Sequence, residues 1–235
     1  TAQTIFPNPA PYALQGGFTF AALFDLDSKT NSSHLYAHGN TTNDIGGGIE
    51  VRLGLSATDT RITVTRSYST DFDQSSPAGD QVSVSAGNVL LITASSNLAV
   101  LPAGRINKST ISFSSGHPST GTMTVSTNSV FLGRREDGGT QLDGRIYLEC
   151  LWNRQLALSE QMAFEDNPWQ IFAPIPARRY FFPNPANPEN STSIAGGTFL
   201  PQRWKKQPQY SVGVNRGSAI ANRINHLYWF GTGSS

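Results

Sequence analysis

The sequence predicts an all-β fold in which two antiparallel sheets pack face to face, as a sandwich or jelly roll, with one short helix and an extended C-terminal tail. About nine or ten short segments alternate apolar and polar residues, and turn residues separate them at near-regular spacing. One stretch near residue 160 changes to a helical pattern. At 235 residues the chain has the size of a single sandwich domain with extensions, and it can bury its own core.

The overall charge argues against two classes of partner. The formal net charge is +1 and only 14% of the residues are charged, so long-range attraction to nucleic acid or to anionic membranes has little support. No apolar run approaches the roughly 20 residues of a membrane-spanning helix, and the N-terminus lacks the pattern of a signal peptide. We expect no nucleic acid and no membrane as partners.

The first third of the chain predicts an arm followed by strands. Residues 1–16 are rich in proline and lack periodicity, which predicts an extended N-terminal arm. Residues 17–26 alternate as a half-buried strand does, and the polar, Gly-rich residues 27–48 predict a loop or short hairpin. The cleanest alternation lies in residues 48–56 and continues in residues 61–67, which together predict an antiparallel hairpin.

The middle of the chain predicts further strands. Residues 88–94, NVLLITA, are apolar on both faces, as expected of a central strand that is covered on both sides. Shorter strands are expected at residues 110–114, 122–126 and 129–133.

The stretch from residue 144 to residue 172 predicts a long strand and the helix. One face of the strand is apolar and consists of Ile146, Leu148, Cys150 and Trp152. The other face is mostly polar, with Tyr147, Glu149 and Asn153, although Leu151 interrupts it. Cys150, the only cysteine, is therefore expected to be a buried, inert thiol.

Residues in this stretch also predict where the helix begins and ends. Ser159 is the expected N-cap, and Glu160 favours the positive N-terminal end of the helix. Asn167 precedes Pro168, which disfavours helical backbone and is expected to end the helix within about two turns.

Residues 132–172 carry a resemblance to a known family. The run from LGR through DGRIYLECLWNRQLALSEQ to NPWQIF resembles the C-terminal signature of concanavalin A-like, laminin-G-type jelly rolls, in which a strand is followed by W/Y-N-R-x-L-s-x-x-E and a short helix. The residues that match this fold signature are Gly133, Gly144, Trp152, Asn153, Leu156, Glu160, Asn167, Pro168 and Trp169. The ending NPWQIFAP, residues 167–174, resembles more particularly the jelly-roll domains of tailed-bacteriophage structural proteins.

Composition divides the chain further. We expect the jelly roll at residues 17–174, a Pro-rich linker at residues 175–197 and an aromatic and basic tail at residues 198–235. The tail is too aromatic for a disordered segment, so it is expected either to complete its own sandwich or to dock on a neighbouring subunit. Its candidate interface residues are Trp204, Lys205, Lys206, Tyr210, Tyr228, Trp229 and Phe230. The segment WKKQPQYSVGVNRGSAIANRI is similar to the opening that often precedes this jelly roll in phage proteins, although here it follows the jelly roll.

The sequence lacks the paired carboxylates of glycoside hydrolases. Such enzymes on this fold use a pattern resembling E-x-D-x-E, which places an acid and a nucleophile or base on one strand, and this chain does not contain it. Asp25 and Asp27 have alternate spacing but lie at a strand end, where solvated carboxylates are ordinary. We therefore expect no catalytic residues and no enzyme activity.

Two clusters contain side chains that can bind a metal ion. Glu136, Asp137 and Asp143 lie among glycines and could supply oxygen ligands for calcium, yet an Asp-Gly turn explains most of that sequence. His34 and His38 lie in the stretch predicted as a loop, where solvated histidines are the expectation and a metal site the alternative. We expect no metal and no cofactor, with calcium as the alternative.

The resemblance implies a non-enzymatic structural protein at the surface of a tailed-phage particle. Surface decoration, a capsid fibre and a tail component all fit that role, and other virion proteins and further copies of the chain are the expected partners. The alternative is a lectin-like, carbohydrate-binding module that recognises host glycans, with Tyr36, Tyr68 and Phe72 as candidate loop aromatics.

Overall fold

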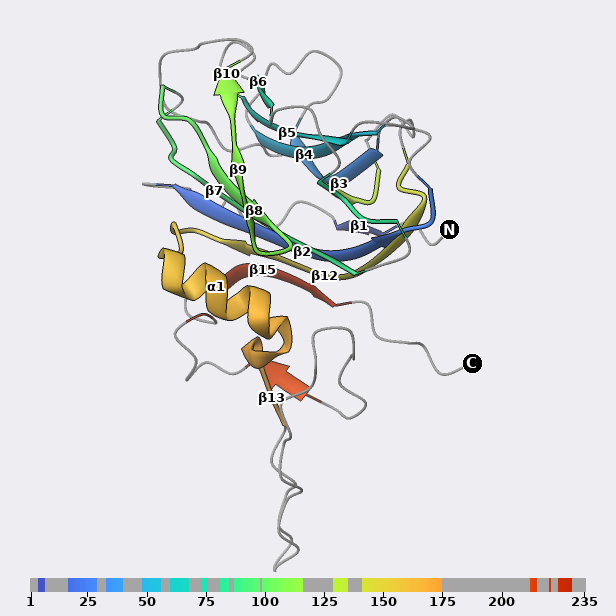
Figure 1. Ribbon diagram of the computed structural model, residues 1–235. Helices are drawn as coiled ribbons and strands as arrows, with labels where there is room; N and C mark the ends of the chain where they lie inside the picture. Colours follow the sequence, from blue (N-terminus) through green and yellow to red (C-terminus); the bar gives the residue numbers. More distant parts are fainter. Residues whose placement is uncertain are drawn as a thin grey trace, which may run out of the picture.

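The computed structural model confirms the two-sheet β-sandwich with one short α-helix (Figure 1). It describes residues 4–6, 17–28, 33–39, 48–55, 60–67, 73–75, 81–84, 87–97, 99–115, 129–134, 141–174, 212–214, 220 and 224–229. The strand expected at residues 122–126 lies outside this part of the chain.

Seven strands form the first antiparallel sheet. Their order across the sheet is β1 (Thr4–Phe6), β11 (Val130–Leu132), β3 (Ser33–Gly39), β4 (Gly48–Leu55), β5 (Thr60–Ser67), β6 (Asp73–Ser75) and β10 (Ser114–Ser115). The predicted hairpin is confirmed, because β4 and β5 pair along their whole length and place Val51 opposite Val64.

Six strands form the second sheet. Their order is β15 (Ile224–Trp229), β12 (Gly144–Trp152), β2 (Phe18–Leu26), β7 (Asn88–Ala94), β8 (Ala103–Ile106) and β9 (Ser109–Ser112). A separate two-stranded ladder joins β13 (Phe172–Pro174) to β14 (Val212–Val214). The strand farthest along the chain, β15, therefore lies beside β12 in the same sheet.

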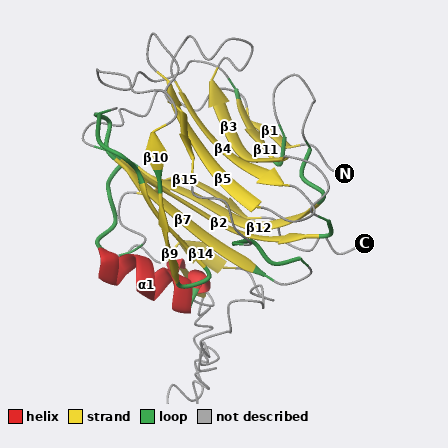
Figure 2. Cartoon of the chain, turned by 45° about the horizontal axis from the view of Figure 1, so that its top comes forward, coloured by secondary structure: helices red, strands yellow, loops and turns green. Residues whose placement is uncertain are grey.

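Two apolar layers hold the fold together. The larger layer lies between the sheets and includes Phe20 and Phe24 of β2 and Val51 of β4, all fully buried. The second layer lies on the outer face of the six-stranded sheet, where helix α1 (Leu158–Asp166), seen beside the strands in Figure 2, and the 3-10 helix η1 (Pro168–Ile171) pack. Strand β7 is buried along its whole length because it lies inside the sheet between these two layers.

Of the two alternatives expected for residues 27–48, a loop or a short hairpin, the structure shows a strand, because residues 33–39 form β3, which pairs antiparallel with β4. A register shift between His34 and Tyr36 turns both Leu35 and Tyr36 toward the core between the sheets. This bulge breaks the period of two that identifies a strand in a sequence. Tyr36 packs its ring 5.5 Å from that of Phe20, so its expected place as an exposed loop aromatic is wrong.

The predicted start of the helix is wrong and its predicted end is confirmed. The N-cap is Ala157 rather than Ser159, and the helix runs from Leu158 to Asp166. It ends before Asn167 and Pro168, as expected of a residue that precedes proline.

A buried arginine ties the first sheet to a loop of the second. Arg66 of β5 lies opposite Ile49, which belongs to the layer between the sheets, and it is fully buried. Its guanidinium donates hydrogen bonds to the carbonyl oxygens of Ser95 and Val100, both at 2.8 Å. Burial lowers the pKa of Arg66 to about 10, so the side chain stays charged at neutral pH.

Candidate functional site

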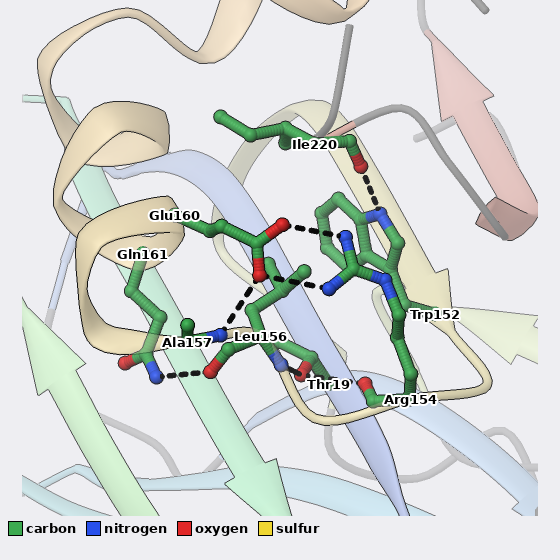
Figure 3. A network of polar contacts seen from close by, with 8 residues as sticks. All are labelled: Thr19, Trp152, Arg154, Leu156, Ala157, Glu160, Gln161 and Ile220. Carbon is green, nitrogen blue, oxygen red and sulfur yellow. Dashed lines mark hydrogen bonds and ion pairs between the residues drawn. The ribbon is translucent and has the colours of Figure 1, made fainter.

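The corner between β12 and α1 contains a polar network that explains several signature residues (Figure 3). The Arg154 guanidinium donates two hydrogen bonds to the Glu160 carboxylate, each at 2.8 Å. Glu160 also accepts the Ala157 backbone N–H at 2.9 Å, at the first free donor of the helix. The hydrogen bond from Arg154 is the main cause that lowers the pKa of Glu160. Since alanine has no side-chain acceptor, Glu160 supplies the half of a capping box that reaches back to the backbone N–H of the N-cap residue.

Thr19 joins this corner to the neighbouring strand β2. Its hydroxyl donates to the Arg154 carbonyl oxygen at 2.9 Å and accepts the Leu156 N–H at 2.9 Å. The Leu156 carbonyl oxygen accepts a hydrogen bond from the Gln161 side chain at 2.8 Å. One hydroxyl thereby satisfies two backbone groups of the turn that leads from the sheet to the helix (Figure 3).

Trp152 joins the same corner to the C-terminal part of the chain. The indole is fully buried, and its N–H donates to the Ile220 carbonyl oxygen at 2.6 Å. The Phe164 ring of α1 meets it edge-on, with 5.7 Å between the ring centroids. Trp152 therefore holds together a strand, a helix and a segment that is distant in the sequence.

The remaining signature residues also have structural positions. Gly133 follows β11 with a φ of +70°, a conformation that disfavours side chains, and its N–H donates to the Leu35 carbonyl oxygen at 2.9 Å. Gly144 begins β12 against β2, where a Cβ would overlap the Asp25 carbonyl oxygen. Asn153 is partly exposed just after β12, and Asn167, Pro168 and Trp169 form the junction of α1 and η1.

Residues 224–229 of the predicted tail complete the chain's own sheet. In β15, Leu227 lies opposite Cys150 and Tyr228 lies opposite Glu149. Of the two alternatives for the tail, the structure thus shows strand completion for this part. Of the seven candidate interface residues, Tyr228 and Trp229 lie in β15, whereas Trp204, Lys205, Lys206, Tyr210 and Phe230 lie outside the described residues.

The sequence analysis placed Glu149 on a polar face of its strand, and this is wrong because Glu149 is 1% exposed. Its neighbours Leu148 and Cys150 belong to the outer apolar layer, so alternation turns Glu149 toward the inside of the sandwich. Burial raises the pKa of the Glu149 carboxyl well above its usual range. Cys150 is buried as predicted, and burial, followed by the nearby Glu149, raises the pKa of its thiol.

The outer face of the seven-stranded sheet carries the polar side chains that a binding site needs. Arg52 of β4 lies opposite His34 on one side and Thr63 on the other, and Glu50 lies opposite Thr65. The His34 Nε2 is 3.7 Å from the Glu50 Oε2. These residues alternate with core residues, so they project away from the layer between the sheets. Glu50 and Arg52 are partly exposed, whereas His34, Thr63 and Thr65 are buried. We call the set His34, Glu50, Arg52, Thr63 and Thr65 the polar face.

The two histidines take positions that the sequence analysis did not predict. His34 and His38 are each 1% exposed, so the expectation of solvated side chains is wrong. His34 lies opposite Arg52 and belongs to the polar face, whereas His38 lies opposite the core residue Ile49. Because the bulge places them on opposite faces, they do not form a pair of ligands. Within the described ranges, no three His, Cys, Asp or Glu side chains form a group that could hold a metal ion.

The acids near the end of β2 interact with the start of β12. The Tyr147 hydroxyl donates to Asp25 at 2.7 Å, and the Ser28 hydroxyl donates to Asp143 at 2.6 Å. The Asp27 backbone N–H donates to the Asp143 carbonyl oxygen at 2.9 Å. Glu136 and Asp137, the other acids of the candidate calcium loop, lie outside the described residues.

Comparison with known proteins identifies the fold. A scan against protein-family models finds no match, and a search of curated proteins finds no relative. Solved structures do match, and one is the heptameric SAP-like pentraxin from Limulus polyphemus, with a TM-score of 0.52 and 12% identity over 69% of this chain and 74% of that one.

Two further matches are domains of a phage tailspike and of a bacterial arabinanase. The enzymatically active domain of bacteriophage CBA120 tailspike protein 2 gives a TM-score of 0.51 and 12% identity over 69% of this chain, but only 25% of that one. Domain 4 of AbnA, a GH43 extracellular arabinanase from Geobacillus stearothermophilus solved with arabinotriose, gives 0.50 and 11% identity over 70% of this chain and 72% of that one.

The chain is therefore a concanavalin A-like jelly-roll β-sandwich. Sequence identities of 11–12% establish a shared fold only, so the function must be argued from the residues of this chain. No helix in the described part of the chain has the length and apolar character needed to cross a membrane.

Proposed function

We propose that this chain is a non-catalytic attachment module at the surface of a tailed-phage particle. The observation that carries the proposal is the difference between the two outer faces of the sandwich. Helix α1, η1 and Ile220 pack on the outer face of the six-stranded sheet, whereas the polar face of the seven-stranded sheet leaves Glu50 and Arg52 partly exposed. The resemblance of residues 167–174 to phage jelly rolls and the shared fold of the tailspike domain support the viral setting.

In this proposal the partners are other virion proteins and further copies of the chain, and neither a metal nor a cofactor is required. The experiment is to follow the chain in purified particles of the phage that encodes it, by mass spectrometry and by immunogold electron microscopy. We expect stoichiometric incorporation and labelling on the outside of the head or tail. Particles that lack the chain, or that carry it only as a trace contaminant, would contradict the proposal.

Recognition of a host glycan is a second candidate function, and the polar face favours it. Arg52 and Glu50 of this set are partly exposed, and their guanidinium and carboxylate can donate to and accept from the hydroxyls of a sugar. His34, Thr63 and Thr65 are buried beside them and can only support these two side chains. The similar AbnA domain was solved with arabinotriose. A glycan array with the full chain tests this function.

The array needs variants that separate the polar face from the rest of the surface. We expect Arg52→Ala to abolish any specific signal and Lys108→Ala, a change in the β8–β9 turn of the other sheet, to leave it unchanged. Equal loss in both variants, or no reproducible signal from the unaltered chain, would speak against a glycan site at the polar face.

A further inference from the structure

The described residues of the C-terminal part, 212–214, 220 and 224–229, meet the rest of the protein at three places. We call β14, Ile220 and β15 together the C-terminal clasp. Strand β14 pairs with β13, with Val214 opposite Phe172. The Ile220 carbonyl oxygen accepts the Trp152 indole N–H, and β15 pairs with β12.

The surface that receives the clasp is built by the other residues of the fold. It consists of the outer edge of β12, the indole N–H of Trp152 and the apolar layer around Phe164 and Trp169. Without the clasp, β12 would have an unpaired edge, and the Trp152 N–H would lose its partner. The receiving surface therefore requires a clasp, but its contacts do not depend on which chain supplies it.

The connection between the two parts is long enough to reach a neighbouring molecule. Residues 175–211 join β13 to β14, and an extended segment of that length spans on the order of 100 Å. A compact chain of this size has a radius of gyration of only about 17 Å. A clasp can thus reach the receiving surface of a second copy that lies beside its own.

We propose that copies of this chain held close together exchange their clasps, so that β15 of one copy completes the six-stranded sheet of another. The exchanged arrangement keeps the strand pairing and the indole hydrogen bond described above and links the two copies. A chain's own clasp and the clasp of a neighbour compete for the same receiving surface. The chain's own clasp is present at an effective concentration of roughly a millimolar, so exchange requires neighbouring copies at a comparable local concentration. This biological setting rests on the proposed function, since a particle surface brings copies that close, whereas the exchange itself can be measured on the purified chain.

A disulfide between adjacent strands reports which chain supplies the clasp. Cys150 is the only cysteine, and Leu227 lies directly opposite it across the β12–β15 ladder. Directly opposed residues in antiparallel strands have the separation that a disulfide needs. The Leu227→Cys protein is oxidised at about 1 µM, far below the millimolar effective concentration of a tethered clasp. Oxidised glutathione accepts two electrons from the two thiols, and we expect the resulting disulfide to lie within one chain.

The exchange experiment divides the thiol pair between two chains. One chain is the unaltered protein with Cys150, and the other carries Cys150→Ala with Leu227→Cys. The chains are mixed at about 1 mM and at about 1 µM, on either side of the expected effective concentration. The chains are mixed in denaturant and oxidised while they refold, at a pH of about 8.5, because Cys150 is buried in the folded protein and the thiolate is the reactive form. Non-reducing electrophoresis then measures the mixed dimer, and each chain oxidised alone gives the background.

We expect mixed dimer well above background at the high concentration and at least about tenfold less at the low one. Absence of mixed dimer at the high concentration, when Leu227→Cys alone forms its internal bond, overturns the exchange. So does a dimer seen by sedimentation without the mixed disulfide, because the copies then associate through another surface. Failure of the internal bond removes the pairing on which the exchange depends. Particle labelling that fails while the mixed disulfide forms would reject the viral role and leave the exchange standing.

Discussion

The carboxyl group of Glu149 lies inside the sandwich, and neither oxygen has a hydrogen-bond partner among the described residues. It lies between Ala22 of β2 and Tyr228 of β15 along the sheet. Desolvation makes the charged form unfavourable there, so the pKa is raised and the group is protonated in the folded protein over a wider pH range than in the unfolded chain.

This pKa shift predicts a stability that falls as pH rises. In the unfolded chain this carboxyl releases its proton above a pKa of about 4.3, whereas in the folded protein it keeps the proton to higher pH. The stability that the protonated group contributes to the folded state is therefore fully present below a pH of about 4.3. It is lost as pH rises through the folded pKa, at up to about 1.4 kcal/mol per pH unit. We expect Glu149→Gln, which cannot ionise, to gain in free energy of unfolding over the unaltered protein between pH 5 and pH 8, as urea denaturation can measure.

Glu160 supplies a control of the opposite sign. Its pKa is lowered, mainly by Arg154, so its contribution is present above the unfolded pKa and lost as pH falls through the folded pKa. Glu160→Gln should therefore cost stability at pH 7, and the cost should shrink as pH falls through the lowered pKa of the folded state. A pH-independent difference for Glu149→Gln would show that the carboxyl does not change protonation on folding.

Thr19 supports the corner between β12 and α1 through its hydroxyl alone. We expect Thr19→Val, which keeps the shape of the side chain, to lower the free energy of unfolding by about 1–3 kcal/mol, because a buried N–H and a carbonyl oxygen lose their partner. Thr19→Ser retains the hydroxyl and should lose clearly less. Equal losses in the two variants, measured by urea denaturation, would assign the effect to the missing methyl group instead.

At the scale of the element, β15 decides whether the C-terminal part anchors the protein or completes its fold. A chain that ends at Pro174 loses the partner of the β12 edge and the acceptor of the Trp152 N–H. We expect this truncation to lower the midpoint of thermal unfolding by 10 °C or more, roughly the effect of losing a few kcal/mol. Removal of residues 230–235 alone should leave the midpoint almost unchanged, and a sandwich equally stable in both truncations would make β15 dispensable.

Elements with an unbroken local pattern could be predicted from the sequence. Strands β4 and β5 alternate cleanly, β7 is apolar throughout, and Pro168 marks the end of the helix, so these elements needed no knowledge of distant contacts. The bulge in β3 removed the alternation around Tyr36, and the pairing of β15 with β12 joins segments whose local sequences do not reveal one another.

The candidate site was less predictable, for a related physical reason. The signature motif located Trp152, Arg154 and Glu160, but the ion pair between Arg154 and Glu160 and the hydrogen bond from Trp152 to Ile220 become visible only through geometry. The polar face is assembled from three strands, and no linear motif places His34 beside Glu50. Thr19 lies far in sequence from the corner that it supports.

At the scale of the whole molecule, the contacts of the clasp should hold two pieces of the chain together without a covalent connection. Strand pairing, the indole hydrogen bond and the apolar layer all lie outside residues 175–211. We therefore expect a protein with a specific protease site inserted between residues 190 and 191 to remain a single native species after cleavage. Its two fragments should elute together from a size-exclusion column and separate only in denaturant.

The cleavage experiment distinguishes a clasp that folds into the sheet from one that the connection merely keeps nearby. Cutting removes the effective concentration of roughly a millimolar that the tether provides, so only the contacts themselves oppose dissociation. Trp152→Phe removes the indole N–H that Ile220 accepts, and after cleavage we expect this variant to release the C-terminal fragment at lower protein concentration than the parent. Release of the fragment from the parent in native buffer would mean that strand pairing with β12 is too weak to complete the sheet, and the exchange of clasps between copies would lose its basis as well.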